Sequence, residues 1–228
     1  MSKKKSGFVI VAILGMLISG CKAELTDFQD ELTKMNEIIQ NEESEIFKED
    51  YMIVSRRKEE YRNEERIIKR DGENYYLKEM VDYANGSRDV SETCYIKAEG
   101  NIYIVYESRS VSLTYREVSA TSYEVTSLNV LLNHYESYYN EASNIIKNVC
   151  AEDNVVCDYS KGIFGNRTIE VTTTEDKYVT VRTITIKKGK LKGATTEVTG
   201  DSNTYEEIEF DYGNQSVKVS NKDSFKKS

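Results

Sequence analysis

Several residue types are missing or scarce in this chain of 228 residues. It has no proline and no tryptophan, while tyrosine occurs 17 times, a bias typical of an AT-rich genome. It also has one histidine, His134, so any Ser-His-Asp or Cys-His arrangement would have to use that residue. Neither a nucleophile elbow, a phosphate loop nor a metalloprotease helix occurs in the sequence. We therefore expect no enzymatic activity and no cofactor, and we interpret His134 as a residue on a helix surface.

A long transmembrane run is also missing. The apolar stretch "FVIVAILGMLI" at residues 8–18 is shorter than the roughly 20 residues that a helix needs to cross a bilayer. It follows three lysines and precedes the small residues Ser19 and Gly20, the arrangement of an export signal with its cleavage site. We therefore predict a cleaved signal peptide at residues 1–20 and a single extracytoplasmic domain at residues 21–228.

The end of this signal carries a specific motif. Ile18, Ser19, Gly20 and Cys21 resemble the lipobox of bacterial lipoproteins. In that family the cysteine sulfur receives a diacylglycerol, and the cysteine becomes the first residue of the mature chain. Two acyl chains, such as palmitate, hold a protein on a membrane where a single chain would release it. The resemblance implies that Cys21 anchors this protein to the extracytoplasmic face of the cell membrane.

Acidic residues outnumber basic residues in this chain. The chain has 31 Lys and Arg against 39 Asp and Glu, a formal net charge of −8, and loss of the signal would remove three of the lysines. A net negative body argues against nucleic acid as a partner and against a surface that lies flat on anionic lipid. We attribute the acidity to solubility.

Three cysteines remain behind the anchor. Cys150 and Cys157 bracket a polar turn, "AEDNVV", that is able to bring them within disulfide distance, so they form either a disulfide or two buried thiols. Cys94 stands at an apolar step of a strand and is expected in the core as a free thiol. No cysteine pair has zinc-finger spacing, and with one histidine we expect no metal site.

Two periodicities divide the mature chain. Apolar residues recur at three- and four-residue steps over about 25–47 and again over about 128–149, which predicts two amphipathic helices. Alternation with period two over about 51–118 and 155–220, punctuated by Asp71-Gly72, Asn85-Gly86 and Gly100-Asn101, predicts two antiparallel meanders. The expected fold class is α+β, with a curved, half-barrel-like antiparallel sheet packed against the two helices.

This order of elements behind a lipobox resembles the half-barrel lipoprotein carriers, the LolA and LppX-like group, whose sheet wraps around helices to enclose an apolar cavity. The resemblance implies a membrane-anchored binding protein for a lipid or another apolar ligand. The alternative is a surface or structural lipoprotein that acts through protein contacts and has no ligand cavity. If a cavity exists, the apolar faces of the second helix and the last clear strand should line it, with Leu131, Tyr135, Tyr138, Ile208 and Phe210.

Overall fold

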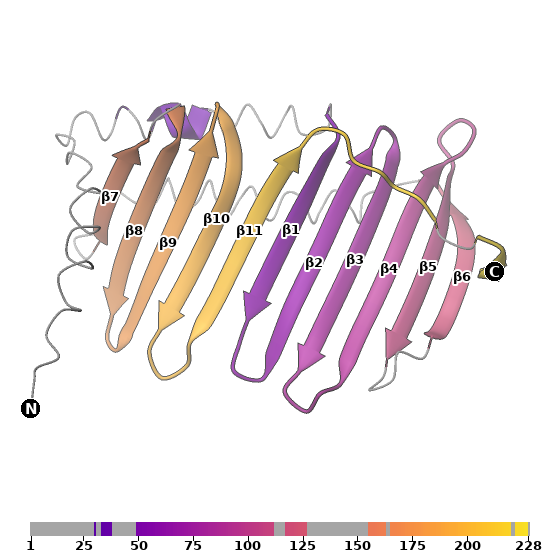
Figure 1. Cartoon of the computed structure of the whole chain (residues 1–228), viewed down its shortest axis with the longest axis horizontal. Coiled ribbons are helices and arrows are strands. Elements are labelled where there is room, and N and C mark those ends of the chain that lie inside the picture. The colour runs from indigo at the N-terminus through magenta and orange to yellow at the C-terminus, as the bar shows by residue number, and fades with distance from the viewer. Residues whose placement is uncertain are drawn as a thin grey trace, which may run out of the picture.

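The structure is a computed structural model, and it describes residues 30, 33–37, 49–111, 117–126, 155–162, 165–219 and 222–227. These residues form one twelve-stranded sheet in the order β12-β6-β5-β4-β3-β2-β1-β11-β10-β9-β8-β7 (Figure 1). All strand pairs are antiparallel except the short β12–β6 pair. The strands are β1 (Tyr51–Lys58), β2 (Arg62–Asp71), β3 (Asn74–Tyr83), β4 (Arg88–Lys97), β5 (Tyr103–Val111), β6 (Glu117–Val125), β7 (Val155–Lys161), β8 (Arg167–Glu175), β9 (Tyr178–Lys187), β10 (Lys190–Thr199), β11 (Thr204–Tyr212) and β12 (Lys226–Lys227), with a 3₁₀ turn, η2 (Lys222–Ser224).

The predicted hairpin turns are present. Gly72 and Gly86 adopt positive φ angles of 58° and 82°, a backbone conformation that glycine enters without steric cost. Gly100 has a φ of 63° between β4 and β5. The segment 53–70, whose charges suit either a helix or a strand, forms the β1–β2 hairpin. Local turn chemistry therefore sets the register of the first meander.

The two meanders join through β1 and β11. Ile53 of β1 lies opposite both Ile68 of β2 and Phe210 of β11, so β1 is a central strand with a partner on each side. The first meander runs outward from this pair through β2 to β6, and the second runs outward through β10 to β7. One continuous sheet results from two halves that are far apart in the sequence.

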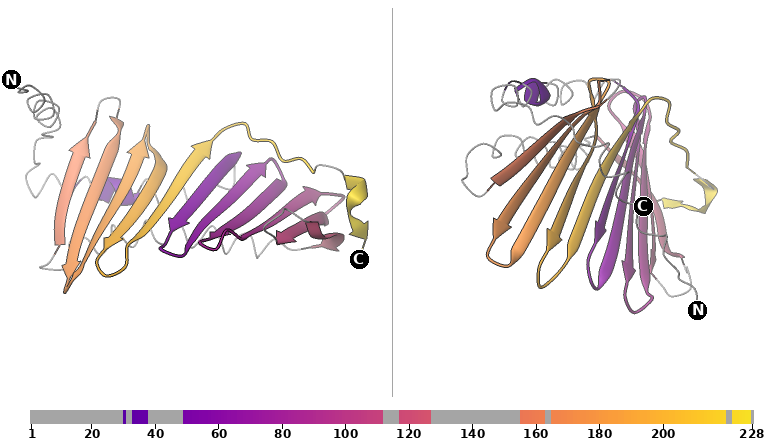
Figure 2. Two further views of the ribbon diagram at one scale, coloured as in Figure 1. Left: turned by 60° about the horizontal axis from the view of Figure 1, so that its bottom comes forward. Right: turned by 60° about the vertical axis from the view of Figure 1, so that its left-hand side comes forward.

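The two faces of the sheet carry different sets of side chains. Residues directly opposite in neighbouring strands lie on the same face. The core face carries a buried cluster that extends from β2 across β1 and β11 to β8, comprising Tyr51, Ile53, Ile68, Ile169, Val171, Ile184, Ile186, Leu191, Ile208 and Phe210, with Met35 of the short helix 33–37. The other face, here called the groove face, carries Tyr76, Cys94 and Tyr106. The helix and the C-terminal segment stand on opposite sides of the sheet (Figure 2).

The predicted fold class is wrong. Among the described residues the sheet dominates and the only α-helical residues are residue 30 and residues 33–37, so the α+β arrangement of a half-barrel-like sheet against two amphipathic helices does not describe this chain. The second predicted helix, 128–149, lies outside the described residues, as does most of the first. The architectural resemblance to the half-barrel carriers therefore carries no further argument.

The physical reason lies in the polarity of β2 to β5. Arg66 Nη2 and Glu79 Oε1 are 2.6 Å apart on the core face. On the groove face, Arg88 Nη2 donates to Asp82 Oδ2 at 2.7 Å. Cross-strand pairs of opposite charge contribute roughly 0.2–1 kcal/mol each and make these positions compatible with water. The groove face of this part of the sheet therefore needs no covering helix, whereas the core face of the same strands carries Ile68 and Val105, with 1% and 0% exposure.

Candidate functional site

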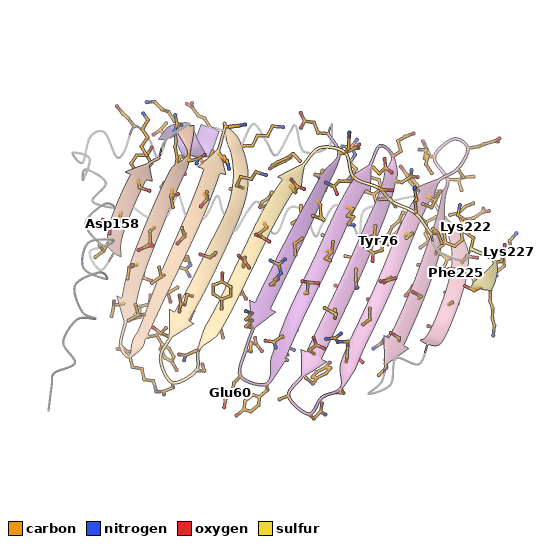
Figure 3. All side chains as sticks on the ribbon, viewed as in Figure 1. Glu60, Tyr76, Asp158, Lys222, Phe225 and Lys227 are labelled. Carbon is orange, nitrogen blue, oxygen red and sulfur yellow. The ribbon has the colours of Figure 1, made fainter. Side chains whose placement is uncertain are left out.

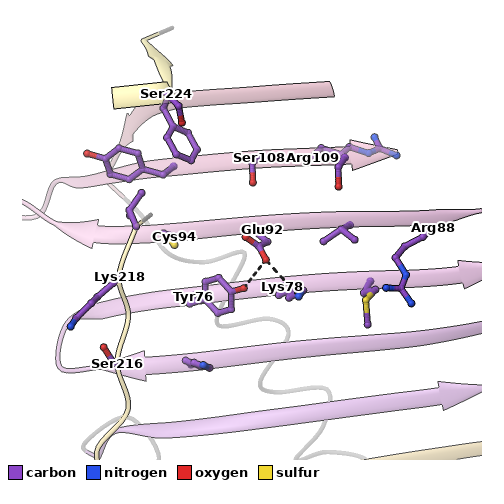
Figure 4. A pocket seen from close by; sticks show the side chains of 17 residues that line it. Tyr76, Lys78, Arg88, Glu92, Cys94, Ser108, Arg109, Ser216, Lys218 and Ser224 are labelled. Carbon is purple, nitrogen blue, oxygen red and sulfur yellow. Dashed lines mark hydrogen bonds and ion pairs between the residues drawn. The ribbon is translucent and has the colours of Figure 1, made fainter. Parts of the chain in front are cut away.

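The groove face of β2 to β5 is hollowed beneath the C-terminal segment. This segment, residues 213–219 and 222–227, leaves β11 and crosses the sheet toward β6 (Figures 1 and 3). Between it and the strands lies a groove of about 730 Å³ (Figure 4). The strands contribute Lys69, Tyr76, Lys78, Met80, Arg88, Val90, Glu92, Cys94, Tyr106, Ser108, Arg109 and Ser110, and the segment contributes Ser216, Lys218, Val219, Ser224 and Phe225.

Strand register arranges the floor in rows. Lys69, Tyr76, Cys94 and Tyr106 are directly opposite one another across β2, β3, β4 and β5, and they form the first row. The second row is Lys78, Glu92 and Ser108, and the third is Met80, Val90 and Ser110. Rows are about 6.6 Å apart, because successive side chains on one face are two residues apart. The first row therefore combines one ammonium group with aromatic rings and a thiol, the second is polar and charged, and the third carries two apolar side chains and a hydroxyl.

Specific contacts hold the C-terminal segment over this floor. Val217 is buried, and its N–H donates to Asp71 Oδ2 at 3.1 Å. Farther along, the Phe225 ring meets the Tyr106 ring edge-on, with centroids 5.3 Å apart and an interplanar angle of 83°. The segment ends in β12, which pairs in parallel with β6. These contacts, spaced along the segment, make it one wall of the groove.

Glu92 is the electrostatic centre of the floor. Its Oε1 accepts a hydrogen bond from the Tyr76 hydroxyl at 3.1 Å and lies 3.7 Å from Lys78 Nζ, as the dashed lines in Figure 4 show. Burial and the Glu92 carboxylate together raise the pKa of Tyr76 above its ordinary value. Tyr76 is therefore a hydrogen-bond donor at neutral pH, and the Glu92 carboxylate lies between this hydroxyl and the Lys78 ammonium group.

Cys94 lies at the end of the floor where the Phe225 ring stands. Its side chain is a free thiol with 7% exposure, so it is buried, but it lies on the groove face and not in the core cluster where the sequence placed it. Burial, and then the nearby Glu92 carboxylate, raise the pKa of the thiol to about 11. Because the thiolate is the reactive form, this cysteine is a weak nucleophile at neutral pH and acts as an apolar part of the floor.

Of the predicted ligand-lining residues, the structure describes Ile208 and Phe210, and neither lines this groove. Ile208 and Phe210 belong to the buried cluster on the core face, with 8% and 4% exposure. Phe210 also borders a smaller hollow of about 390 Å³ on the groove face, where its carbonyl accepts a hydrogen bond from Lys192 Nζ at 3.1 Å. Leu131, Tyr135 and Tyr138 lie outside the described residues.

Other predicted positions also fall beyond the description. Cys21, His134 and Cys150 are outside the described residues, and of Cys157 only the backbone, in β7, is described. Within the described ranges, no group of three or more His, Cys, Asp or Glu is arranged to hold a metal ion. No described helix combines the length and the apolar character that crossing a bilayer requires.

Sequence reasoning missed the groove because its wall has no periodicity. Residues 213–219 form a bend and irregular chain, and residues 222–225 form a 3₁₀ turn and a bend, which the alternation of apolar residues does not detect. One usable signal was present: four lysines against one aspartate follow Asn214, in a chain whose net charge is −8. No family model matches the chain, and no curated protein matches it.

Proposed function

We propose that this protein is a membrane-tethered, extracytoplasmic binding protein that holds a small amphipathic ligand in the groove between β2–β5 and the C-terminal segment. The observation that carries the proposal is the groove itself. Its volume of about 730 Å³ falls within the roughly 300–1,000 Å³ of small-molecule sites. Ligand sites of that kind combine apolar walls with a few placed polar groups.

The lining supports an amphipathic ligand over a wholly apolar one. Tyr106 and Phe225 offer aromatic surface at one end, and Met80 and Val90 offer aliphatic surface at the other. Between them the Glu92 and Lys78 pair presents charge to the groove. A purely apolar ligand would cover these charged groups without satisfying them, which costs free energy. A ligand with its own polar group avoids that cost.

The tether is the second part of the proposal, and it rests on the lipobox-like residues Ile18 to Cys21. A diacylglycerol on Cys21 would keep the domain at the membrane, where amphipathic molecules are concentrated. Attachment would therefore favour binding, because a protein held at a bilayer meets its ligand at high local concentration.

A groove-filling substitution tests binding. Ser108 lies in the second row of the floor and points into the groove, so Ser108→Trp should fill it (Figure 4). The matched control is Thr172→Trp, which adds the same side chain at a half-buried position on the same face of β8, outside the groove. We expect wild type and the control to take up an apolar fluorescent probe, and Ser108→Trp to lose at least tenfold in affinity.

Native mass spectrometry of the protein made in its own host gives an independent readout. We expect a co-purified molecule on wild type that is missing from Ser108→Trp. A wild-type protein that carries no ligand and takes up no probe would refute the binding proposal. A surface or structural lipoprotein that acts through protein contacts would then be the remaining function.

A further inference from the structure

The charge of the groove opposes the charge of the chain. The lining contains five cationic side chains, Lys69, Lys78, Arg88, Arg109 and Lys218, and one anionic side chain, Glu92. The whole chain has a formal net charge of −8. A local excess of positive charge on an acidic protein focuses the field on one place and attracts anions to it.

Pairing within the protein accounts for only part of this excess. Lys78 lies 3.7 Å from Glu92, and Arg88 pairs with Asp82. Lys69 and Lys218, by contrast, have no carboxylate partner within the part of the chain that the structure describes. Lys69 Nζ instead lies 5.7 Å from the centroid of the Tyr76 ring. Among the described residues, these two lysines and Arg109 are therefore the cationic side chains of the groove without a carboxylate partner.

These two lysines belong to the same end of the groove. Lys69 is directly opposite Tyr76 in the first row of the floor, and Figure 4 shows Lys218 and Ser216 on the C-terminal segment beside Tyr76. Each ammonium sits on a flexible four-carbon stem, which lets it turn toward a bound anion. The Ser216 hydroxyl adds a neutral hydrogen-bond donor.

We propose that the ligand is an anionic amphiphile, with its carboxylate or phosphate between Lys69 and Lys218 and its apolar part along the floor toward Tyr106 and Phe225. This inference rests on the proposed binding function and deepens it. It also explains the basic character of the C-terminal segment, which brings Lys218 to a sheet face that already carries Lys69. An uncharged amphiphile would leave both ammonium groups without a partner.

Three probes with the same sixteen-carbon chain separate the parts of this inference. Hexadecanoate and hexadecyl phosphate carry the two candidate anions, and hexadecan-1-ol is their neutral counterpart. An exposed charge pair contributes about a 1.4- to 5-fold change in affinity, so two lysines predict an anion preference of about 2- to 25-fold at low salt. The preference should shrink in about 1 M salt, where the Debye length falls to about 3 Å. The tighter-binding anion identifies the headgroup.

The double variant Lys69→Gln with Lys218→Gln replaces both ammonium groups by neutral amides. It should bind all three probes with the same affinity. Its matched control is Lys226→Gln with Lys227→Gln, which removes the same charge from exposed positions in β12, outside the groove, and should keep the preference. Equal binding of the alcohol and the anions by wild type, or equal losses in both variants, would overturn the anionic inference and leave the binding proposal intact. No binding of any probe would refute the binding proposal itself.

Discussion

The contact of Val217 with the sheet can be tested through the reactivity of Cys94. Val217→Asp places a carboxylate at a position with 7% exposure, beside the Asp71 carboxylate that accepts the Val217 N–H. Loss of valine burial is worth about 1.5–3 kcal/mol, and the two carboxylates repel each other in addition. The C-terminal segment should therefore detach from the sheet far more often than in wild type.

The expected rate change follows from these energies. With the segment in place, the thiol pKa of about 11 leaves about one molecule in a thousand as thiolate at pH 8, and the side chain is covered. Labelling then proceeds through brief openings, so its rate follows the open fraction. A weakening of 1.5–3 kcal/mol multiplies that fraction by about 10 to 150. Alkylation of Cys94 should accelerate by that factor.

The assay is alkylation of the folded full-length protein, with the modified cysteine located by peptide mass spectrometry. Ser216→Asp is the matched control, because it adds the same charge one residue away at an exposed position. It should change the rate less than threefold. Amide hydrogen exchange in β8 to β10 should stay unchanged in Val217→Asp, which shows that the opening is local. Equal labelling of Cys94 in both variants would refute the view that the segment protects it.

Three further predictions concern the anchor, the thiol and the packing of the sheet. Cys21→Ser should abolish incorporation of a radiolabelled fatty acid, and label retained in this variant would contradict the lipoprotein interpretation. The pKa of the Cys94 thiol is 9.0 as a free group and about 11 in the folded state, because burial disfavours the thiolate. The contribution of the buried thiol to the free energy of unfolding is therefore complete below pH 9 and is lost as the pH rises through 11. Wild type should lose about 2 kcal/mol more unfolding free energy than Cys94→Ala between about pH 8.5 and 11.5, whereas parallel curves would refute this linkage. Gly193→Ala should cost about 1–3 kcal/mol in urea unfolding, because its Cβ would stand 2.7 Å from the Ile208 carbonyl oxygen, whereas Gly72→Ala meets no atom within 4 Å and should cost about 1 kcal/mol.

Local sequence rules predicted the strands well and the fold class badly. The alternation in β4 and β11 and the glycine turns at Gly72 and Gly86 are local signals, because backbone sterics act between neighbouring residues. The pairing of Ile53 with Phe210 has no such signal, since it depends on which strand edges meet after the chain has collapsed. The α+β prediction failed because the strands were expected to pack against two helices, whereas the described residues form one twelve-stranded sheet with few helical residues.

The candidate site was harder to predict from the sequence than the fold. Its floor uses residues such as Val90 and Cys94, which lie an even number of residues apart in β4 and therefore share one face. Its wall depends on where an irregular segment crosses the sheet, and one buried valine, Val217, with one hydrogen bond to Asp71, marks that path. Nothing in the local sequence distinguishes this valine from one in a solvated loop. The positive charge of the groove had one partial signal in the sequence, namely the lysines that follow Asn214.

The pairing of β1 with β11 also governs the order of folding. The first meander is able to close hairpin by hairpin, because each of its strands pairs with the next in sequence. The far edge of β1 stays open until residues 204–212 arrive, and open edges invite pairing with other chains. Closing so distant a contact is slow relative to hairpin formation. A chain tethered at its N-terminus would pass this stage among other tethered copies, so the arrival of β11 sets the time during which aggregation competes with folding.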